Sequence, residues 1–277
     1  MADRAVVRAR VEGISRILTI PTIVGRITAM IASGSVSAAE ISEEIAKDQV
    51  LTAKVLKLVN SGFYGFRQPI TTITHAMVLL GLDVVKTIVL TASVMDIIDA
   101  MNQYMQGLWE HSVGTARAAN ALAVRAGMPN PEEVALSGLL HDLGKVIIAQ
   151  TFPAEHARIR EVVGARNCLQ IEAEQEVLGV THPEVGLWLL KKWSLPAKML
   201  YTIAYHSNFH PRRDFADRTA IVHVADIVCR AKGIGNPGDQ RVPALNHDAW
   251  AMLRMTMRDL EDVCDQVDEE LRDGLLT

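Results

Sequence analysis

Six histidine and aspartate residues in the second half of the chain are candidate metal ligands. They are His111, His141, Asp142, His182, His206 and Asp226. Imidazole nitrogens and carboxylate oxygens without cysteine suit iron or manganese, with zinc as an alternative. His141 and Asp142 follow the apolar pair Leu139–Leu140, and polar groups in apolar surroundings are costly unless something pairs with them. A divalent cation would supply that pairing, so these residues predict a site for one or two transition-metal ions.

The residues after Asp142 suggest phosphate chemistry. Gly144 has no side chain and would leave room for a ligand, and Lys145 could hold a phosphate oxygen with its positive charge. A divalent metal lowers the pKa of bound water, which can then attack a phosphoester. In this interpretation Asp142 bridges the metal ions, and Asp142 and Lys145 are the catalytic residues.

Each candidate ligand also has a structural explanation. His111 could bond a backbone carbonyl, His182 could belong to a helix cap together with Glu184, and His206 could lie at the surface. Asp226 follows an apolar run, where an unpaired carboxylate would be costly, and this favours a ligand role. The other histidines are expected to be surface or satisfied core residues: His75, His156, His210, His223 and His247.

The spacing of the candidates fits about one helix for each ligand. From His111 through His141, His182 and His206 to Asp226, the separations are 30, 41, 24 and 20 residues. Each separation corresponds to about one helix and a connection, as in metal sites built inside helical bundles. Helices must therefore position the whole set.

Helical signals surround these residues. The sequence predicts helices over 108–125, 219–232 and 248–272, and helix starts at Asn130–Glu133 (with Asn130 as N-cap), at Thr181–Glu184 and at Pro196. Gly127 and Gly233 are expected to end two of these helices, and the glycine after the His141–Asp142 pair to end a third.

The first part of the chain is also predicted to be helical. Ser37 and Glu40 form a capping box, a second helix begins near Leu51, and helices over 74–80 and 84–94 join at Gly81. One histidine precedes the boundary region 98–106 and eight follow it. We predict an all-α fold, with an N-terminal helical part (residues 1–102) packed on a metal-site part (residues 103–277).

Several motifs together resemble the HDOD family, an HD-related output domain of bacterial signalling proteins. They are Leu51–Ser61, Phe63–Gly65, Ile73–Leu82, Trp109–Ser112, Gly138–Lys145, His182–Gly186 and Tyr205–His206. The similarity covers roughly residues 12–210. It implies an HD-like helical bundle and a regulatory role, in a family of which many members have lost the metal ligands of HD phosphohydrolases. Apart from the resemblance, Phe63–Gly65 is expected to pack the two parts together, with a surface for a partner protein as the alternative.

The full ligand set resembles the binuclear site of the related HD-GYP phosphodiesterases of cyclic di-GMP. Two departures argue against that particular activity. Ile147–Phe152 replaces the GYP element, and Ser207 stands where a second histidine often follows the one that matches His206.

Charge and composition narrow the other possibilities. The net charge of −4 argues against a broad nucleic-acid surface. Residues 37–61 also resemble a helix-turn-helix unit, but four acidic side chains face three lysines there, so DNA binding is not expected. No apolar run is long enough to span a bilayer, and the three cysteines lack CxxC spacing, which predicts a cytoplasmic protein.

Three functions are consistent with the sequence. The first is a bacterial regulatory output protein that retains the metal site and acts mainly by binding a nucleotide or phosphate ligand or a signalling partner. The second is an active metal-dependent phosphohydrolase acting on a nucleotide phosphoester. The third is a metal-free interaction module. The oligomeric state is left open.

Overall fold

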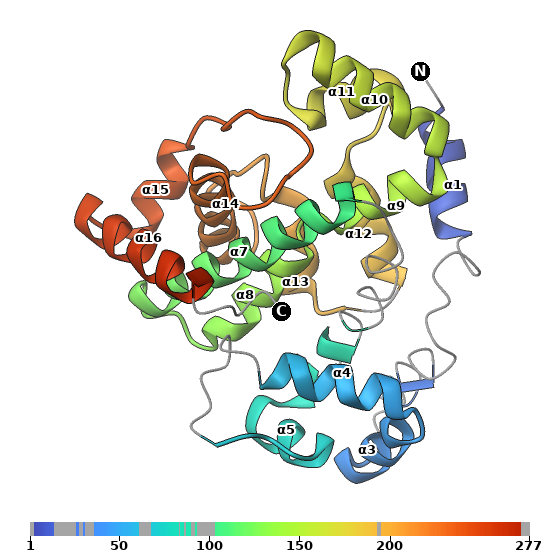
Figure 1. The fold of residues 1–277 in the computed structure, drawn as a ribbon, viewed down its shortest axis with the longest axis vertical. Helices are drawn as coiled ribbons and strands as arrows, with labels where there is room; N and C mark the ends of the chain where they lie inside the picture. Colours follow the sequence, from blue (N-terminus) through green and yellow to red (C-terminus); the bar gives the residue numbers. More distant parts are fainter. Residues whose placement is uncertain are drawn as a thin grey trace. The chain divides into compact units, whose positions relative to one another are not determined.

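The computed structural model describes residues 3–13, 26–27, 30, 36–60, 68–82, 84–85, 87–89, 92, 103–192 and 195–272. Within these residues every regular element is a helix, so the predicted all-α class is confirmed (Figure 1). The chain divides into a larger unit, residues 1–17 and 101–277, and a smaller unit, residues 18–100. None of the described helices combines the length and the apolar character needed to cross a membrane.

The smaller unit contains α3 (Ala38–Ala46), α4 (Gln49–Val59) and α5 (Ile73–Leu80). The predicted capping box at the start of α3 is present, since the Ser37 hydroxyl and the Glu40 carboxylate each bond the other's backbone N–H. Gly81, with φ of 84°, ends α5 as predicted. The motif Phe63–Gly65 and much of the predicted helix 84–94 lie outside the described residues, and the packing of the two parts stays a prediction.

The larger unit is built around a long central helix. Its helices are α1 (Arg4–Glu12), α7 (Gln103–Arg125), α8 (Pro131–Leu140), α9 (Leu143–Thr151), α10 (Pro153–Arg166), α11 (Gln170–Leu178), α12 (His182–Lys192), α13 (Ala197–Tyr205), α14 (Ala216–Ala231), α15 (His247–Leu253) and α16 (Met257–Arg272). α7 packs against α8, α14 and α16, and α12 packs against α9 and α13. Small residues of α7 and branched residues of α14 and α16, such as Ala118, Ile221 and Val263, form a buried core.

The first helix belongs to the larger unit, whereas the predicted boundary near residue 102 grouped it with the N-terminal part. α1 buries Val7 and Val11, which lie one turn apart, and it packs on α12 and α9. Its Arg4 also forms an ion pair of 2.7 Å with Glu184 of α12. Hydrophobic contact thus ties the start of the chain to helices more than 130 residues away.

Two predicted elements differ in detail. The predicted helix 248–272 is two helices, because Arg254 adopts a left-handed conformation (φ 53°) and the chain restarts with a cap formed by Thr256 and Asp259. Asn130 does precede α8, with Pro131 in the first turn, but its φ is 54° and its side chain makes no cap bond. α8 therefore begins with proline and an acidic first turn alone.

Candidate metal centre

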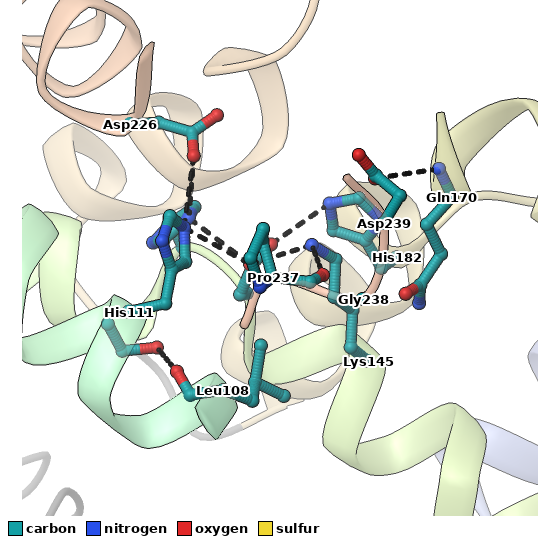
Figure 2. A network of polar contacts seen from close by, with 12 residues as sticks. Leu108, His111, Lys145, Gln170, His182, Asp226, Pro237, Gly238 and Asp239 are labelled. Carbon is teal, nitrogen blue, oxygen red and sulfur yellow. Dashed lines mark hydrogen bonds and ion pairs between the residues drawn. The ribbon is translucent and has the colours of Figure 1, made fainter. Parts of the chain in front are cut away.

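The larger unit brings the six predicted ligands into one buried cluster. His111 lies in α7, His141 and Asp142 join α8 to α9, His182 begins α12, His206 follows α13, and Asp226 lies in α14. Each of the six is at most 6% exposed. Figure 2 shows His111, His182 and Asp226 around this centre. The surface alternative for His206 is wrong, since it is 2% exposed.

The junction of α8 and α9 lets neighbouring residues reach one cluster. α8 ends at Leu140 and α9 begins at Leu143, and His141 and Asp142 lie between them. Their side chains reach residues of α14 and α12. Gly144 does not end a helix, because it lies inside α9. A methyl group on Gly144 would overlap the carbonyl oxygen of His182, so this glycine allows α9 to approach α12 closely. The prediction that Gly144 leaves room for a ligand is therefore wrong.

The donor atoms lie at separations that suit metal ligands. His111 Nε2 is 3.0 Å from Asp226 Oδ1, His141 Nε2 is 3.3 Å from Asp142 Oδ2, and His182 Nε2 is 3.1 Å from Asp142 Oδ1. Two atoms that each bind one ion at about 2.1 Å in a tetrahedral arrangement lie about 3.4 Å apart. The donors form two overlapping sets that share His141: with His111 and Asp226 in one, and with Asp142 and His206 in the other.

Three of the histidine rings are held with the same nitrogen facing the cluster. Nδ1 bonds the Gly138 carbonyl in His141 (2.6 Å), the Ile203 carbonyl in His206 (2.8 Å) and the Glu174 carboxylate in His182 (2.7 Å). Because carbonyl and carboxylate oxygens only accept, these bonds place the proton on Nδ1 and leave the Nε2 lone pair free. This is the usual arrangement of a histidine that binds a metal through Nε2.

Several buried polar atoms in the cluster make no hydrogen bond within the described residues. They are both ring nitrogens of His111, Nε2 of His141 and of His182, and Oδ1 of Asp142. Buried polar atoms are normally paired, and leaving one unpaired costs roughly 1–3 kcal/mol. In its neutral form His182 has a lone pair on Nε2 that faces the carboxylate oxygen of Asp142, and a cation between them would relieve this cost. The residues present therefore fit a divalent metal ion.

The charges of the cluster favour ionised carboxylates. Burial opposes the charge of Asp142, but His141 and Lys145 outweigh it and hold the pKa of that carboxyl well below its usual value. Burial likewise opposes the charge of Asp226, and Arg230 lowers its pKa well below the usual value. Ionised carboxylates are the form that binds metal.

The imidazoles divide into two groups. Burial lowers the pKa of His206 far below its usual value and lowers that of His111 although Asp226 opposes the shift. Burial also disfavours the charged form of His182, but the charge of Glu174 outweighs it, and the pKa of His182 is raised. His206 and His111 are thus neutral near pH 7. The charged form of His182 is favoured instead, because the Glu174 carboxylate stabilises it.

Lys145 lies against Asp142 and is fully buried. Its Nζ donates to Asp142 Oδ2 at 2.7 Å and to the carbonyl oxygen of Pro237 at 2.8 Å (Figure 2). Two of its three N–H donors are therefore used within the protein. Its predicted role in holding a phosphate oxygen stays a prediction.

Sequence reasoning missed three residues that support the candidate ligands, directly or through another side chain. Glu174 in α11 is fully buried and bonds both the backbone N–H and Nδ1 of His182. Arg230 donates to Asp226 Oδ1 at 2.9 Å, and Asp239 accepts from Arg230 at 3.1 Å. Only Arg230 carried a signal in the sequence, because it lies four residues after Asp226 on a helix.

The remaining histidine predictions are consistent with the structure. His223 is a buried core residue whose Nδ1 bonds the His206 carbonyl and whose Nε2 accepts from the Asn246 N–H. His75, His210 and His247 are exposed, and His156 is partly buried. Glu184 has the predicted capping role, since it accepts from the Thr181 N–H at 2.9 Å.

Comparison with known proteins identifies related sequences and folds. A family model described as the HDOD domain matches residues 17–209. A solved structure of an HDOD domain protein with unknown function from Geobacter sulfurreducens is 30% identical, with 99% of this chain and 97% of that chain covered and a TM-score of 0.72.

Two further solved structures share the fold. A "Putative signal transduction protein" from Marinobacter aquaeolei VT8 is 20% identical, with 99% of this chain and 64% of that chain covered and a TM-score of 0.66. A "Putative metal-dependent phosphohydrolase" from Shewanella amazonensis SB2B is 18% identical, with 93% and 91% covered and a TM-score of 0.62.

A curated "Uncharacterized protein" of Treponema pallidum (strain Nichols) is 25% identical over 221 residues, which are 79% of this chain and 43% of that protein. The match thus spans less than half the length of this curated relative.

Proposed function

Because the chain belongs to the HDOD domain family, we propose that it is a regulatory output protein whose buried cluster holds a divalent transition-metal ion. In this proposal the protein acts mainly by binding a ligand, such as a nucleotide or phosphate, or a signalling protein partner. The observation that carries the metal is the set of buried donor atoms that have lone pairs and no hydrogen bond.

The two overlapping donor sets would hold one or two ions. His141 belongs to both sets, and Asp142 offers one oxygen toward His182 and the other toward His141. Nitrogen and oxygen donors without cysteine favour iron or manganese, with zinc as an alternative.

The burial of the site supports a binding role over turnover. All candidate ligands are at most 6% exposed. The ammonium group of Lys145 beside them already donates a hydrogen bond to the Pro237 carbonyl oxygen.

Metal analysis of the purified full chain tests the proposal. Expression with added iron, manganese and zinc should give about one or two equivalents of one metal, in line with the two donor sets. His141→Ala removes the donor common to both sets and should abolish this content, whereas His75→Ala changes an exposed histidine of the smaller unit and should not. An occupancy of wild-type protein below about 0.2 equivalents would instead support the metal-free interaction module.

A metal-dependent phosphohydrolase is the second candidate, favoured by the position of Asp142. Its two oxygens face different histidines, as expected of a carboxylate that bridges two ions. A bound divalent ion would supply a nucleophile by lowering the pKa of water.

A phosphodiesterase screen with manganese or iron separates the two candidates. The substrates are nucleotides, cyclic dinucleotides and a generic phosphoester, and Asp142→Ala is the inactive control. Turnover that exceeds this variant would establish the enzyme. Equal rates for the metal-loaded wild type and the variant would exclude hydrolysis of these substrates and favour the binding role.

A further inference from the structure

Asp239 is a buried carboxylate outside the set of candidate ligands. It lies in the loop between α14 and α15 and is 5% exposed. Burying a carboxylate is costly unless it is paired and hydrogen-bonded. It accepts a local bond from the Arg241 N–H at 3.0 Å, and its contacts with Arg230 and Gln170 lead to opposite ends of the cluster of candidate ligands.

One set of contacts runs through Arg230 to Asp226. Arg230 Nη1 lies 3.1 Å from Asp239 Oδ1 and 3.3 Å from Oδ2, and Arg230 Nε donates to Asp226 Oδ1 at 2.9 Å. That same oxygen of Asp226 lies 3.0 Å from His111 Nε2. Asp239 therefore shares the positive charge of Arg230 with a candidate ligand.

The other set of contacts runs through α11 to His182. Asp239 Oδ2 accepts from the backbone N–H of Gln170 at 2.9 Å, as Figure 2 shows. The side-chain amide of Gln170 donates to Glu174 Oε1 at 2.9 Å, and Glu174 Oε2 bonds His182 Nδ1 at 2.7 Å. A chain of buried hydrogen bonds thus leads from Asp239 to His182.

The loop itself is fixed on the larger unit near α7. The Asn236 N–H donates to the Gly107 carbonyl at 2.7 Å, and the Pro237 carbonyl accepts from Lys145. A side chain at Gly235 would overlap the backbone of His111 and Gly107, so this loop lies directly on α7. Asp239 is consequently held in place beside the cluster.

We propose that Asp239 is a positioning residue of the metal site, acting through Arg230 on Asp226 and through Gln170 and Glu174 on His182. This inference rests on the proposed metal binding. The physical reason is that Arg230 and the metal ion compete for the same oxygen, Asp226 Oδ1. Arg230 also donates to the Arg241 carbonyl at 3.3 Å, but without the charge of Asp239 its remaining carboxylate partner among the described contacts is Asp226, where the guanidinium would oppose a bound cation.

Cobalt titration of the metal-free full chain tests the proposal. Asp239→Asn should weaken Co²⁺ binding by about 10- to 100-fold, the usual effect of changing a group that orients metal ligands. It should also change the visible absorption of bound Co²⁺, because two ligands are reoriented. Asp214→Asn removes an exposed carboxylate and should leave both readouts unchanged. Circular dichroism of the metal-free variants verifies that they are folded.

A double variant distinguishes competition from a general structural effect. Arg230→Gln added to Asp239→Asn removes the competing cation, so Co²⁺ affinity should partly recover. An unchanged affinity in Asp239→Asn, or a double variant no better than the single one, would overturn the proposal.

A second variant covers the case in which Asp239→Asn does not fold. Gln170→Met removes the amide that donates to Glu174 and keeps the backbone N–H that bonds Asp239. It should weaken Co²⁺ binding, whereas unchanged binding would refute the role of this contact chain. If wild-type protein binds no Co²⁺ at all, the proposed metal function fails, which is a separate outcome.

Discussion

The histidines of the cluster are oriented by bonds that are mostly local. His141 and His206 each follow the last residue of a helix, and each bonds the carbonyl oxygen three residues earlier. Carbonyls at helix ends lack partners within the helix, so the ring nitrogen satisfies one of them. The same local geometry therefore points Nε2 of both rings into the cluster.

His182 is different because a distant side chain orients it. Glu174→Gln keeps the shape of the side chain but removes the charge that raises the pKa of His182. The Nδ1–H bond becomes weaker, and the affinity for Mn²⁺ or Co²⁺ should fall by about 10-fold or more. Titration calorimetry on the metal-free protein measures the change.

The matched control for this prediction lies on the same helix. Glu176 pairs with Arg166 at the surface, so Glu176→Gln should leave the metal affinity unchanged. Equal affinities for the wild type and Glu174→Gln would show that Glu174 does not support the ligand.

At the scale of elements, the close approach of α9 and α12 joins two ligand-bearing segments. Gly144 of α9 faces the His182 carbonyl and Gly186 of α12, with no space for a methyl group. Asp142 directly precedes α9 and His182 begins α12, so this contact sets the distance between two candidate ligands.

Gly144→Ala should destabilise the protein by about 1–3 kcal/mol through overpacking and should weaken metal binding. Gly164 is the control: it lies in α10 with open space around it, and Gly164→Ala should be neutral or stabilising by about 0.5 kcal/mol. Urea unfolding measures both changes. A Gly144→Ala variant as stable as the wild type would show that α9 and α12 can separate at no cost.

A buried histidine links α14 to the end of α13. Burial lowers the pKa of His223 below its usual value of 6.5, although the bond to the His206 carbonyl raises it. Because Nε2 accepts from the Asn246 N–H, protonation would break that bond. The folded state therefore favours the neutral ring.

The sign of the pH dependence follows from this shift. Below about pH 6.5 the unfolded chain binds a proton at His223 that the folded chain resists, so the unfolding free energy falls by at most about 1.4 kcal/mol per pH unit. Above that pH, neutral His223 makes its full contribution to the unfolding free energy. Urea unfolding with a chelator at pH 7.5 and 5.5 should show a smaller loss for His223→Gln than for wild type. The exposed His247→Gln should behave like wild type.

At the scale of the whole molecule, the candidate ligands all lie in the larger unit. A metal that binds only the folded state stabilises it by about 2.7 kcal/mol at a hundred times its dissociation constant. Chelation should therefore lower the protection from hydrogen exchange in the helices that carry or adjoin candidate ligands, α7, α8, α9, α12, α13 and α14.

The smaller unit provides the internal reference for this experiment. Exchange in α3, α4 and α5 should change little on chelation, because none of these helices carries a candidate ligand. Equal loss of protection in both units would show that they unfold together, and no change in either would contradict metal binding.

Much of the fold was predictable because the signals are local. Caps such as Ser37–Glu40 and Thr181–Glu184 involve residues three apart, and each marks a helix start. Helix α10 was not predicted because its surface is largely charged and its apolar spacing is weak, with Ile159 its one fully buried residue. The break at Arg254 was missed because arginine rarely adopts a left-handed conformation.

The sequence by itself determined the all-α class and the residue types able to bind a metal, since helix periodicity and donor chemistry depend on neighbouring residues and side-chain identity. Only the tertiary structure decided what supports those donors. Lys145 meets the Pro237 carbonyl across 92 residues, and Gln170 meets Asp239 across 69. Such contacts have no sequence signal, because packing alone sets the distance between their elements. The same packing turned Gly144 from a predicted opening into a helix contact.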